Sequence, residues 1–197
     1  MLGYTIQPPL LSLPLTHQVA FAALTCERML AAISWFDRFE MLPGTPLFRT
    51  AIAALCAFGL NEPIEVDEFA RLQQQLEAFW PDLDESTNPA ASYAFDACVA
   101  LSEALALVQD QELEHLVQCA TAATDTVDMY VQEVTGVDLP PDELNTFLEA
   151  SPLMQRELAR QDALVQALTT EPELTAAMLD QLRFLNGQEQ LVDFSVF

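Results

Sequence analysis

The sequence predicts an all-α protein: a single compact bundle of about seven or eight helices around a central, apolar N-terminal helix. Two observations predict this class. The 197-residue chain is 51% hydrophobic and holds only five glycines, while the helix-favouring residues alanine, leucine, glutamate and glutamine dominate it. Apolar residues also recur at helical spacing without an internal repeat or a domain linker, so we expect one domain over residues 1–197.

The chain is expected to open with an arm and a long helix. Prolines punctuate residues 1–15, so we expect this arm to be extended along the surface. A helix should follow over residues 16–40. Apolar residues surround it on nearly all sides, which is typical of a central helix that packs on several neighbours. Pro43-Gly44 should end it.

Three further helices are predicted by their end signals. One near 46–58 ends at Gly59, and a second near 64–80 carries its large apolar residues on one side. The polar stretch PDLDESTN (81–88) is the clearest loop. Asn88-Pro89 then supplies an N-cap and a first-turn proline for a helix that reaches about Val108.

The sequence of the C-terminal half predicts four helices. An amphipathic helix over 111–135 is closed by Gly136, and a short helix near 142–149 follows two prolines. Ser151-Pro152 is expected to begin the next helix, which runs to about Thr169.

Thr170 and Glu173 resemble a capping box for the last helix, which should end at Asn186-Gly187. The tail, residues 188–197, is apolar. We therefore expect it to dock either on this core or on a second subunit.

The charge of the chain is unusual: 30 acidic residues stand against seven arginines and no lysine, for a net charge of −23. Residues 1–60 are neutral overall, residues 61–155 carry −19 and residues 156–197 carry −4. Such a field repels phosphate backbones and anionic lipids, so we expect neither nucleic-acid nor membrane binding. A basic protein partner is the alternative to a purely solubilising role.

The sequence favours a cytoplasmic location. The uncharged first 26 residues lack the basic start of a signal peptide and are broken by prolines, and no other apolar run reaches the length of a spanning helix. The four cysteines lie in apolar, helix-like segments without a C-x-x-C pair: Cys26, Cys56, Cys98 and Cys119. This pattern indicates buried free thiols in a reducing compartment.

Known catalytic patterns are missing from the sequence. A di-iron bundle needs Glu-x-x-His on two helices. Glu112 and His115 supply one pair, but the other histidine, His17, follows Pro14 at that spacing. Apolar surroundings raise thiol pKa values, and no glycine-rich phosphate loop occurs. We therefore predict no metal, no cofactor and no catalytic residue.

Arg28 is the polar residue to which the sequence draws attention, because it lies in an aromatic stripe of the first long helix. Such an arginine either extends outward to solvent or is buried, and a buried guanidinium needs a carboxylate. Asp96 and Glu103 lie two turns apart on one face of an otherwise apolar helix. We predict that Arg28 pairs with at least one of them. This buried constellation is either structural or part of a ligand site, whereas a plain solvated stripe would also explain the two acids.

Two strings resemble the signature regions of the YjaG-like proteins, a bacterial family of domains of unknown function: HQVAFAALTCERM (17–29) and FDACVALSE (95–103). The resemblance extends over the chain, with QLEAF at 75–79 and EHLV at 114–117. It implies an all-helical cytoplasmic protein and transfers no catalytic residue. The lack of lysine departs from that pattern.

Three functions are left open by the sequence. The first is a non-catalytic interaction or regulatory protein that self-associates as a homodimer. The second is an acidic inhibitor or immunity-type protein that binds a basic partner. The third is a small-ligand-binding protein or enzyme with a pocket around Arg28, Asp96 and Glu103.

Overall fold

Helices joined by loops make up the part of the chain that the structure, a computed structural model, describes: residues 8–40, 43–65, 67–186 and 190–196. No strand occurs in these residues, so the predicted all-α class is confirmed. The helices are α1 (Pro8–Leu11), α2 (Leu15–Glu40), α3 (Gly44–Gly59), α4 (Glu68–Phe79), α5 (Ala91–Asp110), α6 (Leu113–Thr135), α7 (Pro141–Glu149), α8 (Pro152–Thr170) and α9 (Ala176–Asn186), followed by the 3₁₀ turn η1 (Phe194–Val196).

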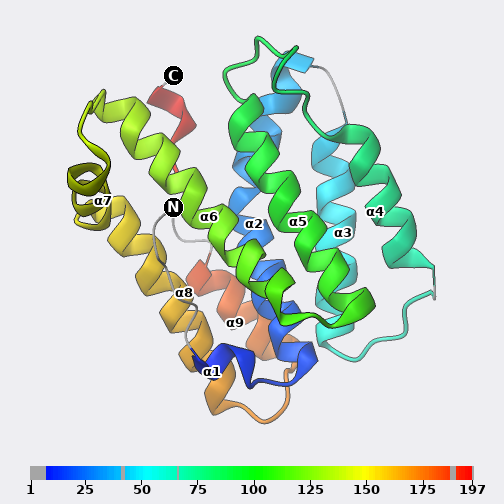
Figure 1. Cartoon of the computed structure of the whole chain (residues 1–197). Coiled ribbons are helices and arrows are strands. Elements are labelled where there is room, and N and C mark those ends of the chain that lie inside the picture. Colours follow the sequence, from blue (N-terminus) through cyan, green and yellow to red (C-terminus); the bar gives the residue numbers. More distant parts are fainter. Residues whose placement is uncertain (1–7, 41–42, 66, 187–189, 197) are drawn as a thin grey trace.

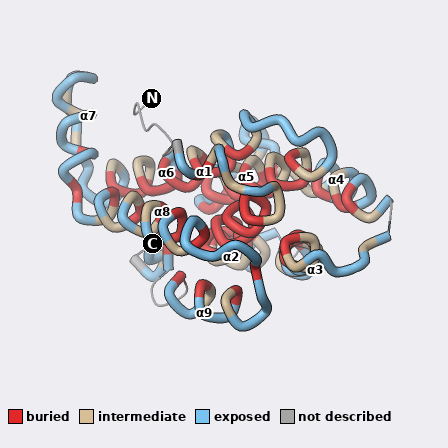
Figure 2. Tube along the Cα trace, turned by 90° about the horizontal axis from the view of Figure 1, so that it is seen from below, coloured by how far each residue is buried: buried red, intermediate tan, exposed pale blue. Residues whose placement is uncertain are grey.

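Helix α2 is the central element, as predicted. It contacts α3, α5, α6, α8 and α9. Every residue from 17 to 26 is buried, so this part of the helix has no solvent face, which explains why its sequence is apolar on nearly all sides. Figure 2 shows two layers, one of α4, α5 and α6 and one of α3, α2 and α8, with α9 outside the second layer.

The helix ends agree with the sequence at α8 and differ at α9. Oγ of Ser151 accepts a hydrogen bond from the backbone N of Met154 over 3.2 Å, which is the predicted N-cap of α8. The predicted capping box of the last helix is wrong: Thr170 is the final residue of α8, and α9 is capped by Oγ1 of Thr175. Buried Leu174 packs against Gly59 and delays the helix start.

The N-terminal arm is not extended where the structure describes it. Residues 1–7 lie outside the described part, and Pro8–Leu11 form the short helix α1. Leu10 is fully buried. Nε2 of Gln18 donates to the carbonyl of Leu11 over 3.2 Å, so the arm is held against α2. Prolines are tolerated here because the first N–H groups of a helix need no intrahelical partner.

The described part of the C-terminal tail docks on the chain's own core. Leu191 and Val192 are buried, and the ring of Phe194 stacks on Trp35 with centroids 4.7 Å apart. Residues 188, 189 and 197 of the predicted tail lie outside the described residues. Of the two predicted docking places, the structure shows the first.

Two helices, α2 and α5, are long and apolar enough to span a membrane by length and composition. In α2, 78% of the most apolar window is buried inside the protein, and in α5 the buried share is 56%. Core helices pass the same length test. The cytoplasmic location therefore stays a prediction.

The turn between α2 and α3 is held by one carboxylate. Oδ1 of Asp37 accepts from the backbone N of Gly44 over 3.1 Å, and Oδ2 accepts from that of Thr45 over 2.7 Å. Asp37 thus satisfies two free N–H groups at the start of α3, which has no cap from its own N-cap residue, Pro43. Because Asp37 belongs to α2, the same bonds fix the angle between the two helices.

Replacing Asp37 by alanine should lower the free energy of unfolding by about 1–2 kcal/mol, because both N–H groups lose their acceptor. Asp67→Ala is the matched control. Asp67 stands at the N-cap of α4, is exposed and makes no capping bond there, so its removal should cost less than about 0.5 kcal/mol. Urea unfolding followed by circular dichroism measures both. Equal losses in the two variants would contradict the assigned cap.

Candidate functional site

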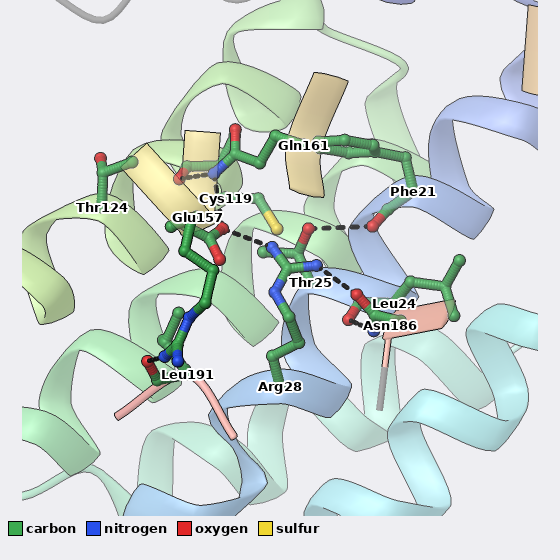
Figure 3. Close-up of polar contacts among 12 residues, drawn as sticks. Phe21, Leu24, Thr25, Arg28, Cys119, Thr124, Glu157, Gln161, Asn186 and Leu191 are labelled. Carbon is green, nitrogen blue, oxygen red and sulfur yellow. Dashed lines mark hydrogen bonds and ion pairs between the residues drawn. The ribbon is translucent and has the colours of Figure 1, made fainter. Parts of the chain in front are cut away.

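The candidate site is centred on Arg28, near the middle of the central helix α2. Only 5% of this residue is exposed. Its Nη2 donates to Oε1 of Glu157 in α8 over 2.6 Å, and its Nη1 donates to Oδ1 of Asn186 in α9 over 2.6 Å (Figure 3). The structure therefore places the guanidinium in the interior with an acidic partner and an amide partner, each from a different helix.

Two amide side chains extend this ion pair into a network. Nε2 of Gln161 donates to Oε1 of Glu157 over 2.9 Å and to the backbone O of Ala120 in α6 over 3.2 Å. Nδ2 of Asn186 donates to the backbone O of Leu24 over 2.7 Å. The network thus joins α2, α6, α8 and α9. We call its four side chains the buried cluster: Arg28, Glu157, Gln161 and Asn186.

The buried cluster retains hydrogen-bonding capacity that its own members do not use. The side chains of Arg28 and Glu157 are each 1% exposed. Even so, Nε of Arg28, Oε2 of Glu157 and Oε1 of Gln161 form no hydrogen bond with a described residue. A buried polar atom without a partner costs about 1–3 kcal/mol. The cluster is therefore a place where an additional polar group would be stabilised.

The predicted partner of Arg28 is wrong. The structure pairs Arg28 with Glu157 and not with Asp96 or Glu103. The physical reason is the direction of the faces: the guanidinium lies between α8 and α9, whereas the carboxylates of Asp96 and Glu103 bond to residues of α6, in the other layer. The structure does not bring the three predicted residues together.

Asp96 lies at the contact of α5 with α6, where its Oδ2 accepts from Oγ1 of Thr126 over 3.0 Å. Burial raises the pKa of Asp96 to about 7, with nearby Asp125 adding to the rise and the Thr126 bond opposing it. Burial and the neighbouring Asp128 also raise the pKa of Asp125. These carboxylates therefore form a partly desolvated acidic surface on α5 and α6.

Glu103 meets the histidine that the sequence places on the polar side of its helix. Oε2 of Glu103 lies 2.5 Å from Nδ1 of His115, and Oδ2 of Asp110 lies 3.0 Å from Nε2 of the same ring. The hydrogen bond to Glu103, together with that to Asp110, raises the pKa of His115. This contact links the end of α5 to the start of α6. Among the described residues, no three His, Cys, Asp or Glu side chains converge as a metal site requires.

Glu157 was not predicted as a partner of Arg28, although the spacing of residues in its helix indicates that it is buried. The buried face of α8 runs through Met154, Glu157, Gln161, Leu164 and Leu168. These positions follow a spacing of three, four, three and four, so the acid and the amide stand in the middle of an apolar stripe. An acid inside such a stripe indicates a buried partner. Three other charged residues of α8, Arg156, Arg160 and Asp162, are only partly buried, so charge alone does not single out Glu157.

All four thiols are buried and free, as predicted. The neighbouring Cys119 and burial raise the pKa of Cys26, and burial raises that of Cys98. Burial also raises the pKa of Cys56 to about 11, although Arg183 opposes this rise through an Nη2 contact of 3.1 Å with the sulfur. Thiols held in this way carry little thiolate near neutral pH and are poor nucleophiles.

A groove runs along α2 beside the buried cluster. Its first part is a hollow of about 280 Å³ between α2 and α9, with Arg28, Arg183 and Asn186 in its lining. Its second part, of about 380 Å³, is bounded by Trp35 and residues 193–195. Both parts share Ala31, Ser34 and Gln190, so they adjoin. We call the two parts together the groove.

Glu157→Gln should lower the free energy of unfolding by about 3–5 kcal/mol, because it leaves the enclosed guanidinium uncompensated. Glu68→Gln is the control, since Glu68 pairs with Arg71, whose side chain is 51% exposed. That change should cost less than about 1 kcal/mol. The double variant Arg28→Met, Glu157→Leu should recover most of the loss. Urea unfolding gives all three values. A Glu157→Gln loss no larger than that of Glu68→Gln would refute the role of the ion pair.

His115→Ala should be more destabilising in acid than in alkali. The pKa of His115 is raised in the folded state, so its imidazolium stabilises the fold fully below the ordinary pKa of 6.5. This stabilisation is lost as the pH rises through the raised pKa. Because His115 is partly exposed, the difference should stay below about 1 kcal/mol. Unfolding of the wild type and the variant at pH 5.5, 7 and 9 measures it. A pH-independent gap would show that the imidazolium adds nothing.

The family model described as "Protein of unknown function (DUF416)" matches residues 5–191. A crystal structure of a DUF416 family protein from Shewanella baltica OS155 is similar in fold, with a TM-score of 0.81 and 25% sequence identity. The match covers 91% of this chain and 92% of that one. The search among curated proteins found no match. Because the family model spans nearly the whole sequence, the chain belongs to the DUF416 family.

Proposed function

We propose that this protein is a non-catalytic interaction protein that self-associates as a homodimer through the outer face of α9. The observation that carries the proposal is the exposure of two neighbouring apolar side chains: Phe184 is 70% exposed and Leu185 is 59% exposed. Contiguous apolar side chains on a surface mark interaction sites. From the two signature strings, we also propose that the chain is a YjaG-like member of its family.

The outer face of α9 carries little charge. Its exposed positions are Ala176, Ala177, Asp180, Gln181, Phe184 and Leu185. Asp180 is the single charged residue among them. Arg183 lies on the side of α9 that faces α2, where its Nε donates to Oε1 of Glu27 over 2.8 Å. Figure 2 shows α9 on the outside of the second layer, so this face is free to meet another surface.

The distribution of charge favours a second copy as the partner of this face. Helices α4, α5 and α6 together hold nine acidic residues and one arginine. Helices α2, α3, α8 and α9 together hold six of each. Two molecules of charge −23 repel each other least when their acidic layers point apart. A contact between two α9 faces has this geometry.

The proposal of a non-catalytic role is supported by how the reactive groups are used. All four thiols are buried, and the pKa values of Cys26, Cys56 and Cys98 are raised. Of the two histidines, His115 lies between two carboxylates, and Nε2 of buried His17 lies 3.1 Å from the carbonyl of Glu171. In each histidine both ring nitrogens are engaged, whereas acid–base catalysis needs one of them within reach of a substrate.

Sedimentation velocity tests the proposal. The wild type should be a dimer at about 100 µM, and the double variant Phe184→Ser, Leu185→Ser should raise the dimer Kd at least about tenfold by removing apolar area. Phe147→Ser on α7 is the matched control, since Phe147 is 36% exposed on another helix and should leave the Kd unchanged. A monomeric wild type, or a dimer that both variants leave intact, would rule out this interface.

A second candidate function is supported by the acidic surface on α5 and α6. Burial raises the pKa values of Asp96 and Asp125 there, with a neighbouring carboxylate adding to each rise, so a cationic group placed beside them would favour their charged forms. This surface would suit a basic protein partner. Salt separates the two candidates: raising NaCl from about 50 to about 500 mM should strengthen contact between α9 faces and weaken binding of a basic partner.

A further inference from the structure

The groove gathers positive charge in a strongly acidic molecule. Arg28 and Arg183 line its first part and Arg38 lines its second part, so three of the seven arginines of the chain lie along it. Two acids also line it, Glu27 and Asp193. The first part is lined by two arginines and one acid, of which Arg183 pairs with Glu27, while Arg28 pairs with Glu157 behind the lining. Close positive groups attract an anion that the distant acidic layer repels only weakly through solvent.

The arginines of the first part have donors to spare. Arg183 binds Glu27 through Nε and contacts the sulfur of Cys56 through Nη2, while its Nη1 makes no hydrogen bond to a described residue. The Nε–H of Arg28, which is nine-tenths buried, likewise has no acceptor in the described chain. Guanidinium groups with free N–H donors match the two oxygens of a carboxylate.

The second part of the groove is lined by two aromatic rings among polar groups. The rings of Trp35 and Phe194 stack there with their centroids 4.7 Å apart and their planes 26° from parallel. Aromatic faces bind other flat rings by offset stacking. Ala31 lines both parts, and its small side chain leaves the arginines and the rings in one continuous groove.

We infer that the groove binds a small organic acid with a single carboxylate and an aromatic tail. The carboxylate lies against Arg183 in the part that Arg28 also lines, and the tail lies against the Trp35–Phe194 stack. A monoanion fits better than a polyanion, because every added charge increases repulsion from a protein of net charge −23. This binding is independent of the proposed contact through α9.

Isothermal titration with three probes tests the inference: 4-phenylbutyrate, its neutral amide 4-phenylbutyramide, and inorganic phosphate. The full-length protein should bind 4-phenylbutyrate with a Kd below about 1 mM and change its tryptophan fluorescence, since Trp35 lines the groove. The amide should bind at least about tenfold more weakly, because it lacks the charge that Arg183 recognises. Phosphate should neither bind at millimolar concentration nor compete.

Three variants identify the site. Arg183→Gln should weaken binding about tenfold or more. Arg71→Gln is its control, because this change also breaks one arginine–glutamate pair but does so on α4, away from the groove. It should change the Kd less than about twofold. Arg38→Gln removes an exposed arginine that forms no ion pair with a described residue and should weaken binding without loss of stability. Ala31→Phe fills the groove without a change of charge and should abolish binding.

The inference fails if 4-phenylbutyrate does not bind, or if Arg71→Gln weakens binding as much as Arg183→Gln does. It also fails if the amide binds as well as the acid, since the arginines would then recognise nothing. Equal binding of phosphate would replace the organic acid by a general anion site. Unchanged binding in Ala31→Phe would place the ligand outside the groove.

Discussion

The arrangement of the second layer depends on one ion pair in an apolar interior, that between Arg28 and Glu157. Apolar burial holds helices together without specifying their register, because it has no direction. A guanidinium that is 1% exposed tolerates few arrangements. Its bonds to Glu157 and Asn186 fix where α8 and the end of α9 lie along α2. The groove follows from this, because Arg28 and Asn186 both line it.

The two layers differ in what they present to solvent. The layer of α4, α5 and α6 carries nine acids, which keep a half-hydrophobic chain soluble. The other side is electrically balanced and contains the groove, the exposed apolar face of α9 and the buried cluster. The acidic surface and the exposed apolar side chains of α9 thus lie on opposite sides of the central helix.

Local signals allowed most helices to be predicted. Ser151-Pro152 starts α8, Gly136 closes α6, and α2 is apolar on all sides because it is enclosed by five helices. Prediction failed where a contact between residues far apart in the sequence determines a helix end or an ion-pair partner. Thr170 and Thr175 both suit an N-cap, and the burial of Leu174 decides between them. Periodicity likewise identified a buried arginine, yet it says nothing about which helix lies opposite, and the partner is 129 positions away.

The long distance in sequence between Arg28 and Glu157 has a consequence during synthesis of the protein. Arg28 leaves the ribosome well before Glu157 exists, and at about 5–20 residues per second the 129 intervening positions take roughly 6–26 s to translate. Throughout this interval the nascent chain carries an apolar segment whose internal cation lacks its final partner. Helix α2 therefore cannot reach its final environment until the C-terminal helices emerge, so its packing is completed only late in synthesis.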